Sequence, residues 1–320
     1  TSFKSSSLNV FLEFIGFIQT ISTLIIVRPQ ILHAASIKGI IYGGLAAKIL
    51  RINSLVISIS GLGFAFTGKK TLLKKILSFI FMIIFRIVCS HKNKKVIVQN
   101  EDDKNFILTN GFAILDEIEL IKGSGVDLSL FKYNELDSNN KKIIFPARLL
   151  IDKGVVEFLK SSEILFNKFP DWKFILVGAD DYKNPSVISK ELLNSYLLQK
   201  NIINLGFVKN MHEIFNDSAI VCLPSYREGM PKSLLEAASV GRPIVTTNTI
   251  GCKESIIDNY TGLLVPVGNS RLLSKALKKL MESASLRKEF GLNGRKFAED
   301  NFDVRIVQNK TIEIYKELIL

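Results

Sequence analysis

The sequence contains few cysteines, and their positions exclude the sites that cysteines usually build. Three are present among 320 residues, and Cys89, Cys222 and Cys252 lie far apart along the chain. This spacing gives neither a disulfide framework nor a zinc-binding pattern, and it suits the reducing cytoplasm. The sequence also begins at Thr1 without a methionine or a signal-peptide pattern, which indicates a fragment or a processed chain.

The first long apolar stretch, Leu8–Val27, is not a favourable membrane span. Its length would cross a bilayer, but Asn9, Glu13 and Gln19 within it would be costly in lipid. A buried helix packed across a sheet is therefore the favoured interpretation, and a bilayer span is the alternative.

A second stretch, Thr71–Lys95, combines apolar and basic residues. Its uninterrupted apolar core, from Phe79 to Phe85, is too short to span a bilayer. The cations Lys74, Lys75 and Arg86 flank this core, and His91–Lys95 adds more. Aromatic residues with basic flanks are typical of a helix lying on an anionic membrane surface. The alternative is a core helix with solvated basic ends.

The chain has a shortage of negative charge. Its net charge is +12 and its pI is about 9.5. Such a surplus suits nucleic acid, an anionic membrane or a phosphorylated substrate. The sequence contains no nucleic-acid-binding motif, which favours the last two partners and no nucleic acid.

Strand and helix patterns alternate along the chain, and 320 residues fit two domains better than one. Together these features predict an α/β protein with parallel sheets. The polar segment 132–142 reads as the interdomain linker. We expect a first domain at 1–135, a second at 136–305 and a final helix, 306–320, that crosses back to the first.

One strand, loop and helix carry the strongest functional signal. The apolar run Ala219–Leu223 predicts a buried strand, and a polar loop follows it. Pro231 and Gly241 suit the start and the end of a helix. Amides at such a helix start can receive an anion. Glu228 lies in the loop, and Glu236 lies in an apolar part of the helix, which favours a buried hydrogen-bonding role over a solvated one.

Further loops bring cations to the same predicted edge. Arg148 and Lys153 follow the strand predicted at Ile143–Ala147, and parallel strands would place them beside the loop of Glu228. Each cation alone would be read as a surface charge. With the helix start, the two indicate a pyrophosphate site.

The segment E-G-M-P-K-S-L-L-E, from Glu228 to Glu236, resembles the retaining nucleotide-sugar glycosyltransferases of family 4. These have the GT-B fold, in which two Rossmann-like domains face a cleft. Other stretches resemble the same family at Pro146–Gly154, Phe174–Gly178, Gly206–Val208, Gly241–Thr247 and Tyr260–Pro266. A subgroup that adds amino sugars to polyprenyl-pyrophosphate-linked glycans is similar at His33–Gly39, Ser60–Gly68, Val98–Asp103 and Gly123–Leu128.

The resemblance implies roles in binding the donor nucleotide. Arg148 and Lys153 would hold the donor pyrophosphate. Glu236 would bind the ribose, and the backbone near Val208 would contact the base. Family members need no metal, and this sequence has no Asp-x-Asp motif. No cofactor is implied beyond the UDP-sugar that serves as the donor substrate.

The resemblance also implies contacts with the donor sugar. Glu228 and the amides of Gly229 and Met230 would meet its hydroxyl groups. His33 resembles the histidine that faces the donor sugar across the cleft, and the alternative is a core histidine with satisfied hydrogen bonds. Family members have a strand, a Gly-rich loop and further strands before this histidine, whereas only residues 1–32 precede it here. The resemblance thus implies an N-terminal domain truncated at its start.

These features predict a retaining transferase at the inner face of the cell membrane. It would move an N-acetylhexosamine or a related amino sugar from a UDP-sugar to a lipid-linked saccharide, in bacterial-type surface glycan synthesis. Two alternatives stay open at this point. One is a sugar-nucleotide epimerase on the same fold, and the other is a non-catalytic UDP-sugar-binding remnant of a transferase.

Overall fold

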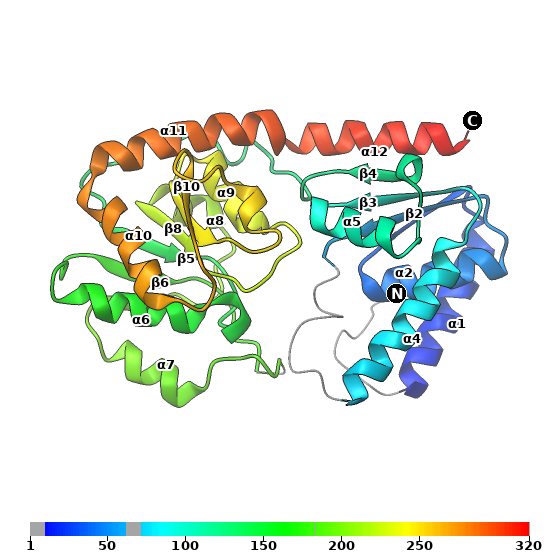
Figure 1. Cartoon of the computed structure of the whole chain (residues 1–320), viewed down its shortest axis with the longest axis horizontal. Coiled ribbons are helices and arrows are strands. Elements are labelled where there is room, and N and C mark those ends of the chain that lie inside the picture. Colours follow the sequence, from blue (N-terminus) through cyan, green and yellow to red (C-terminus); the bar gives the residue numbers. More distant parts are fainter. Residues whose placement is uncertain (1–9, 62–71, 183, 320) are drawn as a thin grey trace. The chain divides into compact units, whose positions relative to one another are not determined.

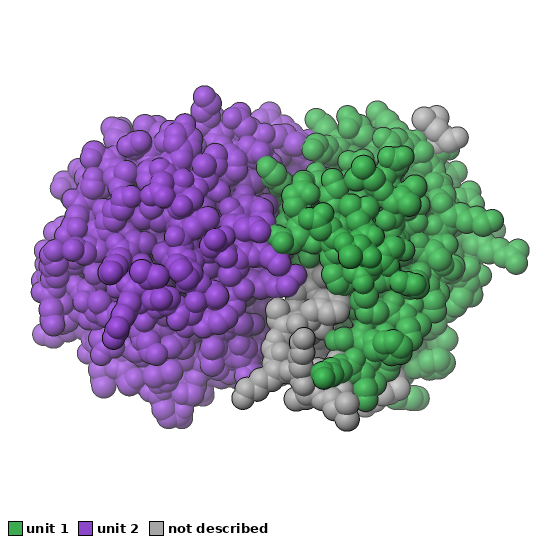
Figure 2. Space-filling model, in the orientation of Figure 1, with its two compact units in different colours: residues 1–122, 308–320 green, residues 123–307 purple. Residues whose placement is uncertain are grey.

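In the computed structural model, which describes residues 10–61, 72–182 and 184–319, the strands form two parallel sheets in two separate units (Figure 1). Unit 1 comprises Thr1–Lys122 and Gln308–Leu320, and unit 2 comprises Gly123–Val307 (Figure 2). The α/β class with parallel sheets, predicted from the alternating patterns, is confirmed.

Unit 1 is built on four parallel strands in the order β1-β2-β3-β4. They are β1 (Ile31–Ala35), β2 (Ser54–Ile59), β3 (Lys94–Val98) and β4 (Ile118–Leu120). Its helices are α1 (Val10–Val27), α2 (Ile37–Ile49), α4 (Leu72–Cys89), α5 (Glu101–Thr109), the 3-10 helix η1 (Leu115–Glu117) and the end of α12 (Val304–Ile319). Because each strand pairs with the next one along the chain, right-handed crossovers place the connecting helices on one face of the sheet.

Small residues in α2 allow it to lie close to both the sheet and α4. A Cβ atom at Gly43 would lie 3.4 Å from the Leu32 side chain of β1. At Gly44, a Cβ atom would lie 2.3 Å from Val88 Cγ1 of α4, so only glycine permits this approach. α2 also contacts α1, so it packs against both α1 and α4 in the helical layer.

The last part of α12 covers the other face of this sheet (Figure 1). The backbone oxygen of Leu318 accepts hydrogen bonds from Ser54 Oγ at 2.9 Å and Asn93 Nδ2 at 3.1 Å. Glu317 pairs with Lys95 of β3 at 2.7 Å. Because α12 begins in unit 2 and these contacts lie in unit 1, the chain returns to its first unit at its end.

Unit 2 contains a six-stranded parallel sheet in the order β10-β9-β8-β5-β6-β7. The strands are β5 (Lys142–Phe145), β6 (Lys173–Leu176), β7 (Ile202–Asn204), β8 (Ile220–Leu223), β9 (Ile244–Thr247) and β10 (Gly262–Val265). From β5 the chain proceeds to β6 and β7 at one edge of the sheet, and from β8 it proceeds to β9 and β10 at the other edge. Right-handed crossovers then place helices on both faces, as in a Rossmann-like sheet.

The helices of unit 2 fall into two packed groups, with α6 against α10 and α9 against α8 and α11. Their bounds are α6 (Val155–Phe166), α7 (Lys190–Leu197), α8 (Met211–Asn216), α9 (Lys232–Ser239), α10 (Ser270–Glu282) and α11 (Ala284–Asn301), with the 3-10 helices η2 (Ile151–Lys153) and η3 (Lys253–Ser255). Pro231 is the N-cap of α9 and Gly241, with φ 80°, follows its C-cap. The predicted strand, loop and helix around Glu228 are thus confirmed.

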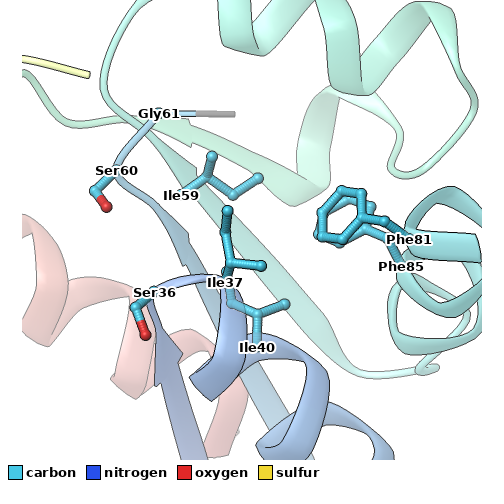
Figure 3. A pocket seen from close by; sticks show the side chains of 8 residues that line it. All are labelled: Ser36, Ile37, Ile40, Ile59, Ser60, Gly61, Phe81 and Phe85. Carbon is cyan, nitrogen blue, oxygen red and sulfur yellow. The ribbon is translucent and has the colours of Figure 1, made fainter. Parts of the chain in front are cut away.

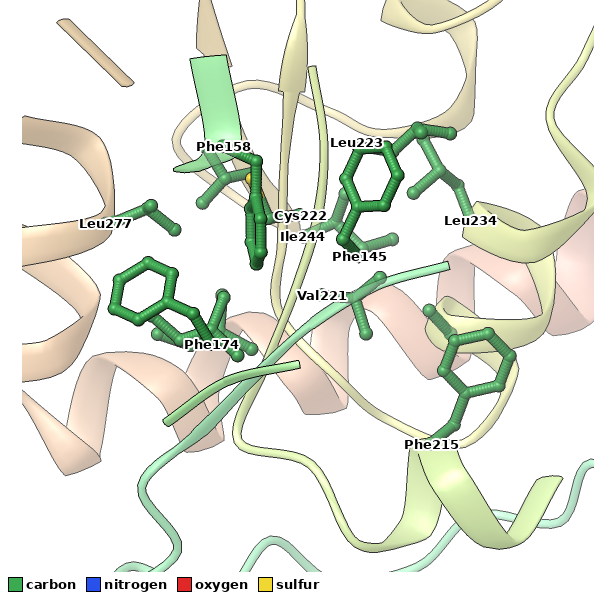
Figure 4. Packing of buried hydrophobic residues seen from close by; sticks show 14 of the residues in the cluster. Phe145, Phe158, Phe174, Phe215, Val221, Cys222, Leu223, Leu234, Ile244 and Leu277 are labelled. Carbon is green, nitrogen blue, oxygen red and sulfur yellow. The ribbon is translucent and has the colours of Figure 1, made fainter. Parts of the chain in front are cut away.

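Aromatic rings join the strands of unit 2 to its helices (Figure 4). The ring of Phe158, on α6, lies 5.3 Å from that of Phe145 on β5 and 5.3 Å from that of Phe174 on β6, between centroids. All three side chains are buried, as are Val221 and Cys222 of β8. Burying a phenylalanine contributes about 1.5–3 kcal/mol, so this cluster holds the strands whose ends carry the predicted site.

The predicted linker and the first domain boundary are wrong. Segment 132–142 belongs to unit 2, and the unit boundary lies at Lys122 rather than at 135. The buried Arg242 guanidinium donates a hydrogen bond of 2.7 Å to Asn134 O, and Arg287 donates one of 2.8 Å to Ser138 O. Two arginines from distant parts of the chain therefore fix a segment that looks like a linker in sequence.

The interpretation of α1 as a buried helix is wrong for one of its two sides. Leu24 is buried, and Phe17 and Ile21 pack against the core of unit 1. Phe14 is 62% exposed and Ile26 is 82% exposed. The apolar residues of α1 therefore serve two faces, only one of which packs on the protein.

Candidate functional site

The predicted site residues of unit 2 lie at the edge of its sheet where the strand order reverses. β5 and β8 are neighbours, and the chain leaves them toward opposite edges of the sheet. The loops at their carboxyl ends, residues 146–154 and 224–231, therefore lie side by side at the switch point of the sheet, and this position above β5 and β8 is called the crevice below. Open parallel sheets bind their ligands in such crevices. The parallel pairing that the sequence argument required is confirmed.

Two glycines let the loops of this edge approach one another through their backbones. Gly154 has φ 79°, and a Cβ atom there would lie 2.1 Å from Pro224 O. Gly251 has φ 82°, and its Cβ atom would lie 2.4 Å from Glu228 O. Both positions combine a left-handed conformation with a contact that excludes a side chain. The loops after β5, β8 and β9 are thus in direct contact.

Asp152 connects three of these loops. Its backbone oxygen accepts hydrogen bonds from Tyr226 N at 2.9 Å and from Ser225 Oγ at 3.1 Å. Its carboxylate accepts one from Ser186 Oγ at 2.5 Å. Ser225 and Tyr226 follow β8, whereas Ser186 follows β6. Asp152 therefore fixes the backbone next to Lys153, the predicted phosphate ligand.

Lys153 and Glu228 form an ion pair across the crevice. The distance from Lys153 Nζ to Glu228 Oε1 is 2.6 Å, and the two side chains are only 21% and 14% exposed. The amide of Glu228 is held by a hydrogen bond of 3.0 Å to Ile250 O. The structure therefore brings together one predicted phosphate ligand and the predicted sugar ligand. A donor phosphate would compete with Glu228 for this lysine.

Glu236 lies on α9, within the part of the helix that packs into unit 2. It is 8% exposed, and burial raises the pKa of its carboxyl group. Lys232, one turn earlier, places its Nζ 3.6 Å from Glu236 Oε1, and its positive charge partly opposes the rise in this pKa. The buried position expected for Glu236 is confirmed, while its proposed contact with a ribose stays a prediction.

Arg148 follows β5, as expected, but its contact is with a residue that the sequence argument did not consider. Its Nη1 lies 2.7 Å from Asp181 Oδ2, in the loop after β6. The Arg148 side chain is 52% exposed. An exposed pair of this kind is weak, so the guanidinium can exchange Asp181 for another anion at little cost.

The other predicted donor contacts occupy loops of the same unit. Gly229 and Met230 are the last loop residues before Pro231, and the Met230 side chain is buried. Val208 is half-buried and packs against Ile144 and Val177. This packing holds the backbone segment that is predicted to contact the nucleotide base.

His33, the remaining predicted site residue, lies on β1 in unit 1. Its Nδ1 is 2.5 Å from the hydroxyl of Tyr315 on α12, and its Nε2 is 2.6 Å from Ser58 Oγ on β2. Although part of the ring is exposed, desolvation lowers the pKa of this histidine. Both ring nitrogens have hydrogen-bond partners, as the core-histidine alternative requires, but His33 is exposed and not in the core, and its catalytic role stays a prediction.

A small pocket in unit 1 lies at the carboxyl ends of β1 and β2 (Figure 3). Ser36 and Ser60 lie on one side of it, and Phe81 and Phe85 of α4 lie on the other. Gly61, at its edge, belongs to Ser60–Gly68, one of the stretches that resemble the subgroup, and residues 62–68 of that stretch lie outside the described residues.

The described residues contain no cluster of three or more His, Cys, Asp or Glu side chains suited to a metal ion. Among the described helices, none has the length and hydropathy that crossing a membrane requires. The three cysteines are free and buried.

Sequence reasoning missed Asp152, Asp181 and the direct pairing of Lys153 with Glu228. Asp152 precedes the predicted lysine, but its main role depends on its backbone oxygen, which carries no sequence signal. Asp181 is one of two adjacent aspartates, and nothing in the sequence distinguishes it from Asp180.

Comparison with known proteins agrees with this geometry. Residues 128–297 match the family described as Glycosyl transferases group 1, and residues 2–100 match Glycosyl transferase 4-like. The first match covers more than half of the chain and contains the whole crevice. The chain belongs to the glycosyl transferases group 1 family. It is therefore an enzyme of the hexosyltransferase type.

Named relatives and solved structures support the same assignment. A Campylobacter jejuni protein named N,N'-diacetylbacillosaminyl-diphospho-undecaprenol alpha-1,3-N-acetylgalactosaminyltransferase is 29% identical over 99% of this chain and 85% of its own length. The Escherichia coli UDP-Gal:alpha-D-GlcNAc-diphosphoundecaprenol alpha-1,3-galactosyltransferase is 24% identical over 92% of this chain and 76% of its own. Anabaena Alr3699/HepE, crystallised with UDP and glucose, has a TM-score of 0.78, 19% identity, and coverage of 94% of this chain and 80% of its own.

These likenesses show the GT-B fold, with one Rossmann-like sheet in each unit. The named relatives are transferases that act on diphospho-undecaprenol-linked glycans, and this does not favour the epimerase alternative.

Proposed function

We propose that this glycosyltransferase moves an amino sugar, an N-acetylhexosamine or a close relative, from UDP to a saccharide on a polyprenyl-diphosphate lipid. The observation that carries the proposal is the cation and acid pair, Lys153 and Glu228, in the crevice between β5 and β8. The names of the C. jejuni and E. coli relatives support the lipid-linked acceptor, and the former supports an amino sugar.

In this proposal the residues of unit 2 bind the donor from its base to its sugar. The backbone near Val208 contacts the base, and the buried Glu236 accepts hydrogen bonds from the ribose. Lys153 and Arg148 exchange Glu228 and Asp181 for the diphosphate oxygens. Gly229 and Met230 present their amides to the sugar hydroxyls.

The chemical step forms a bond between the acceptor oxygen and the anomeric carbon of the donor sugar, and it breaks the bond from that carbon to the diphosphate. With retention, the acceptor hydroxyl enters on the face that the diphosphate leaves. Its proton passes to the departing phosphate oxygen. Lys153 and Arg148 stabilise the negative charge that develops there. Glu228, released from Lys153, orients the sugar hydroxyls, and no covalent intermediate is part of the proposal.

His33 keeps the predicted role at the donor sugar in this scheme. Because Ser58 and Tyr315 occupy its ring nitrogens, that role requires one of these hydrogen bonds to be exchanged. The substitution Tyr315→Phe would release Nδ1 without touching the ring, and it is the natural companion to His33→Ala in an assay.

The proposed location is peripheral, on the inner face of the cell membrane, where a lipid-linked acceptor is available. The basic and aromatic segment Thr71–Lys95 supports this location. Phe79 on α4 is 67% exposed and Ile83 is 47% exposed. The side chains of Thr71 and Lys74 lie outside the described residues, whereas Lys75 and Arg86 are exposed. An exposed apolar stripe with cations suits an anionic membrane surface.

The direct test is transfer from radiolabelled UDP-N-acetylhexosamines to a polyprenyl-diphosphate-linked saccharide. We expect Glu228→Ala to lower transfer by about 100-fold or more, because it removes a contact with the reacting sugar. Glu282→Ala is the matched control, since Glu282 pairs with Lys168 on the surface at 2.9 Å. Equal transfer by wild type and Glu228→Ala would refute the proposed site, and no transfer by the wild type would refute the substrates.

A further inference from the structure

The loop after β9, residues 248–255, contacts the backbone of Glu228 on two sides and is here called the β9 loop. The Glu228 amide donates a hydrogen bond of 3.0 Å to Ile250 O. Gly251 packs against the carbonyl of the same residue, because a Cβ atom added there would lie 2.4 Å from Glu228 O. The conformation of the β9 loop therefore determines where the backbone of Glu228 lies, and with it the reach of the carboxylate.

Hydroxyl groups attach the two loops at a second point. Ser225 O accepts a hydrogen bond of 3.2 Å from Thr249 Oγ1 in the β9 loop and another from Thr247 Oγ1 at the end of β9. The two hydroxyl oxygens are themselves 3.0 Å apart. Ser225 and Glu228 are three residues apart in one loop, so both ends of this short stretch are held by the β9 loop or by the strand before it.

Glu254 holds the β9 loop in its own conformation. Its Oε2 accepts a hydrogen bond of 2.8 Å from Gly251 N, and its side chain is only 18% exposed. Gly251 has φ 82°, a left-handed conformation, and the bond fixes its amide at this turn. A hydrogen bond to a carboxylate is roughly twice as strong as a neutral one. Glu254 is thus connected through Gly251 to the residue that is predicted to contact the donor sugar.

A neighbouring cation, Lys253, restrains Glu254 only weakly. Its Nζ lies 3.7 Å from Glu254 Oε1, and the lysine side chain is 38% exposed. Ion pairs that are this exposed contribute little to stability. Because the pair uses the other carboxylate oxygen, it is compatible with the bond to Gly251 N, which is the stronger of these two contacts.

The residues predicted to bind the nucleotide lie outside the β9 loop. Arg148 and Lys153 follow β5, Val208 follows β7, and Glu236 lies on α9. The contacts described above lead instead from Glu254 to Glu228, the predicted sugar ligand. A change at Glu254 should therefore affect the handling of the donor sugar and spare the binding of the nucleotide.

We propose that Glu254 is a positioning residue, which acts through Gly251 to place the backbone of Glu228 so that its carboxylate meets the donor sugar. The inference rests on the proposed function, which gives Glu228 this contact. Glu254 itself touches neither the donor nor the acceptor. A misplacement of about 1 Å in a group that orients the reacting centre can lower the rate by about 100-fold, so an anchor outside the site can control transfer.

Amide hydrogen exchange tests the positioning without any substrate. In Glu254→Ala the Glu228 amide should exchange at least about tenfold faster than in the wild type, because its acceptor, Ile250 O, lies in a loop that has lost a charged anchor. Glu117→Ala is the matched control, since Glu117 Oε2 also accepts a hydrogen bond from an amide three residues earlier, Ile114 N at 3.0 Å, in unit 1. It should leave exchange of the Glu228 amide unchanged.

Two conservative variants separate the hydrogen bond from the charge. Glu254→Gln keeps an oxygen that accepts from Gly251 N, and it should retain slow exchange of the Glu228 amide. Glu254→Asp keeps the charge, but its shorter side chain withdraws the carboxylate from Gly251 N, so it should behave like Glu254→Ala. If thermal unfolding shows that Glu254→Ala is not folded at the assay temperature, Glu254→Asp takes its place.

Transfer kinetics test the consequence for the reaction. Glu254→Ala should lower kcat by about 10- to 100-fold. It should weaken UDP binding by no more than about twofold, because the nucleotide ligands lie in other loops. In a protein that already carries Glu228→Ala, adding Glu254→Ala should lower transfer by less than about twofold further, since both changes remove the same contact.

Unchanged exchange of the Glu228 amide in Glu254→Ala, or an additive loss of kcat in the double variant, would overturn the proposal. A loss of UDP affinity as large as the loss of transfer would also overturn it, because it would show a general disturbance of the crevice. The proposed function fails separately. No transfer by the wild type, with exchange as expected, would refute the substrates and leave Glu254 as the anchor of Glu228.

Discussion

Both units are parallel α/β sheets, yet they distribute their charged and apolar residues differently. In unit 2 the charged residues Lys153 and Glu228 are paired in a half-buried crevice at the carboxyl edge of the sheet. In unit 1, Arg28, Arg51, Arg86 and Lys92 are exposed, and the helices α1 and α4 expose apolar side chains as well. The same architecture therefore carries a partly buried ion pair in one unit and exposed cations beside exposed apolar side chains in the other.

The use of glycine shows the same contrast. In unit 2, Gly154 and Gly251 lie in loops and let the backbones around the crevice touch. In unit 1, Gly43 and Gly44 lie inside α2 and let that helix approach the sheet and α4. Glycine thus brings loops together at the carboxyl edge of the sheet in unit 2, and it brings α2 close to the sheet and to α4 in unit 1.

The largest expected effect is on transfer activity, from Lys153→Met. Removing the cation that faces the departing diphosphate should lower kcat/KM by about 100- to 1000-fold. Lys168→Met is the control, because Lys168 also pairs with a glutamate in unit 2 but lies at an exposed surface position. Steady-state transfer kinetics measure the difference. Similar losses of kcat/KM in the two variants would show that transfer does not depend specifically on the lysine of the crevice.

The next effect concerns loop packing, in Gly154→Ala. A methyl group there would meet Pro224 O and would also occupy a left-handed conformation, so we expect the free energy of unfolding to fall by about 3 kcal/mol or more. Gly206→Ala is the matched variant, since Gly206 has φ 64° and nothing within 4 Å of its added Cβ atom. It should lose only about 1 kcal/mol from backbone strain. Urea unfolding would show the two values, and equal losses would mean that the loops can separate freely.

A smaller effect is expected on stability, as a pH-dependent difference in the free energy of unfolding between Glu236→Gln and the wild type. Burial raises the pKa of Glu236 in the folded protein above its usual value of 4.5, so the folded state favours the protonated form. The stability that this preference contributes is present below pH 4.5 and is lost as the pH rises through the folded pKa. The variant should therefore become more stable relative to the wild type as the pH increases above 4.5. A difference that stays constant with pH would show that the carboxyl group is not desolvated.

The smallest effect is expected from Asp181→Asn. Because the Arg148 and Asp181 side chains are 52% and 32% exposed, the loss of their pair should change the free energy of unfolding by less than about 1 kcal/mol. Releasing Arg148 should leave the KM for the donor the same or lower it slightly. A clear rise in donor KM would show that Asp181 positions the guanidinium rather than competing with the phosphate.

The local parts of unit 2 could be predicted from the sequence. The apolar run at Ala219–Leu223, Pro231 and Gly241 define a strand, a loop and a helix through local preferences alone. The convergence of Lys153 and Glu228 at one edge also followed, because parallel strands place their carboxyl ends together. The direct ion pair of Lys153 with Glu228 was not predicted, because the lysine was assigned to the donor pyrophosphate and the glutamate to the donor sugar.

The features that sequence reasoning missed depend on distant contacts or on solvent exposure. Segment 132–142 is polar and looks like a linker, but Arg242 and Arg287 hold its backbone oxygens from about 100 or more residues away in the sequence. The apolar residues of α1 surround the helix, a pattern that usually indicates complete burial. Whether the outer ones are covered depends on the neighbouring elements, which hydrophobicity alone does not define.

Calorimetric titration with UDP tests the central claim, that the donor nucleotide binds in the crevice between β5 and β8. Lys153→Met should weaken UDP binding by about tenfold or more, because a hydrogen bond to a charged group is lost. Glu228→Gln should bind UDP at least as tightly as the wild type, because it releases Lys153 and removes no nucleotide contact. Unaltered UDP affinity in Lys153→Met, or a large loss in Glu228→Gln, would contradict the account.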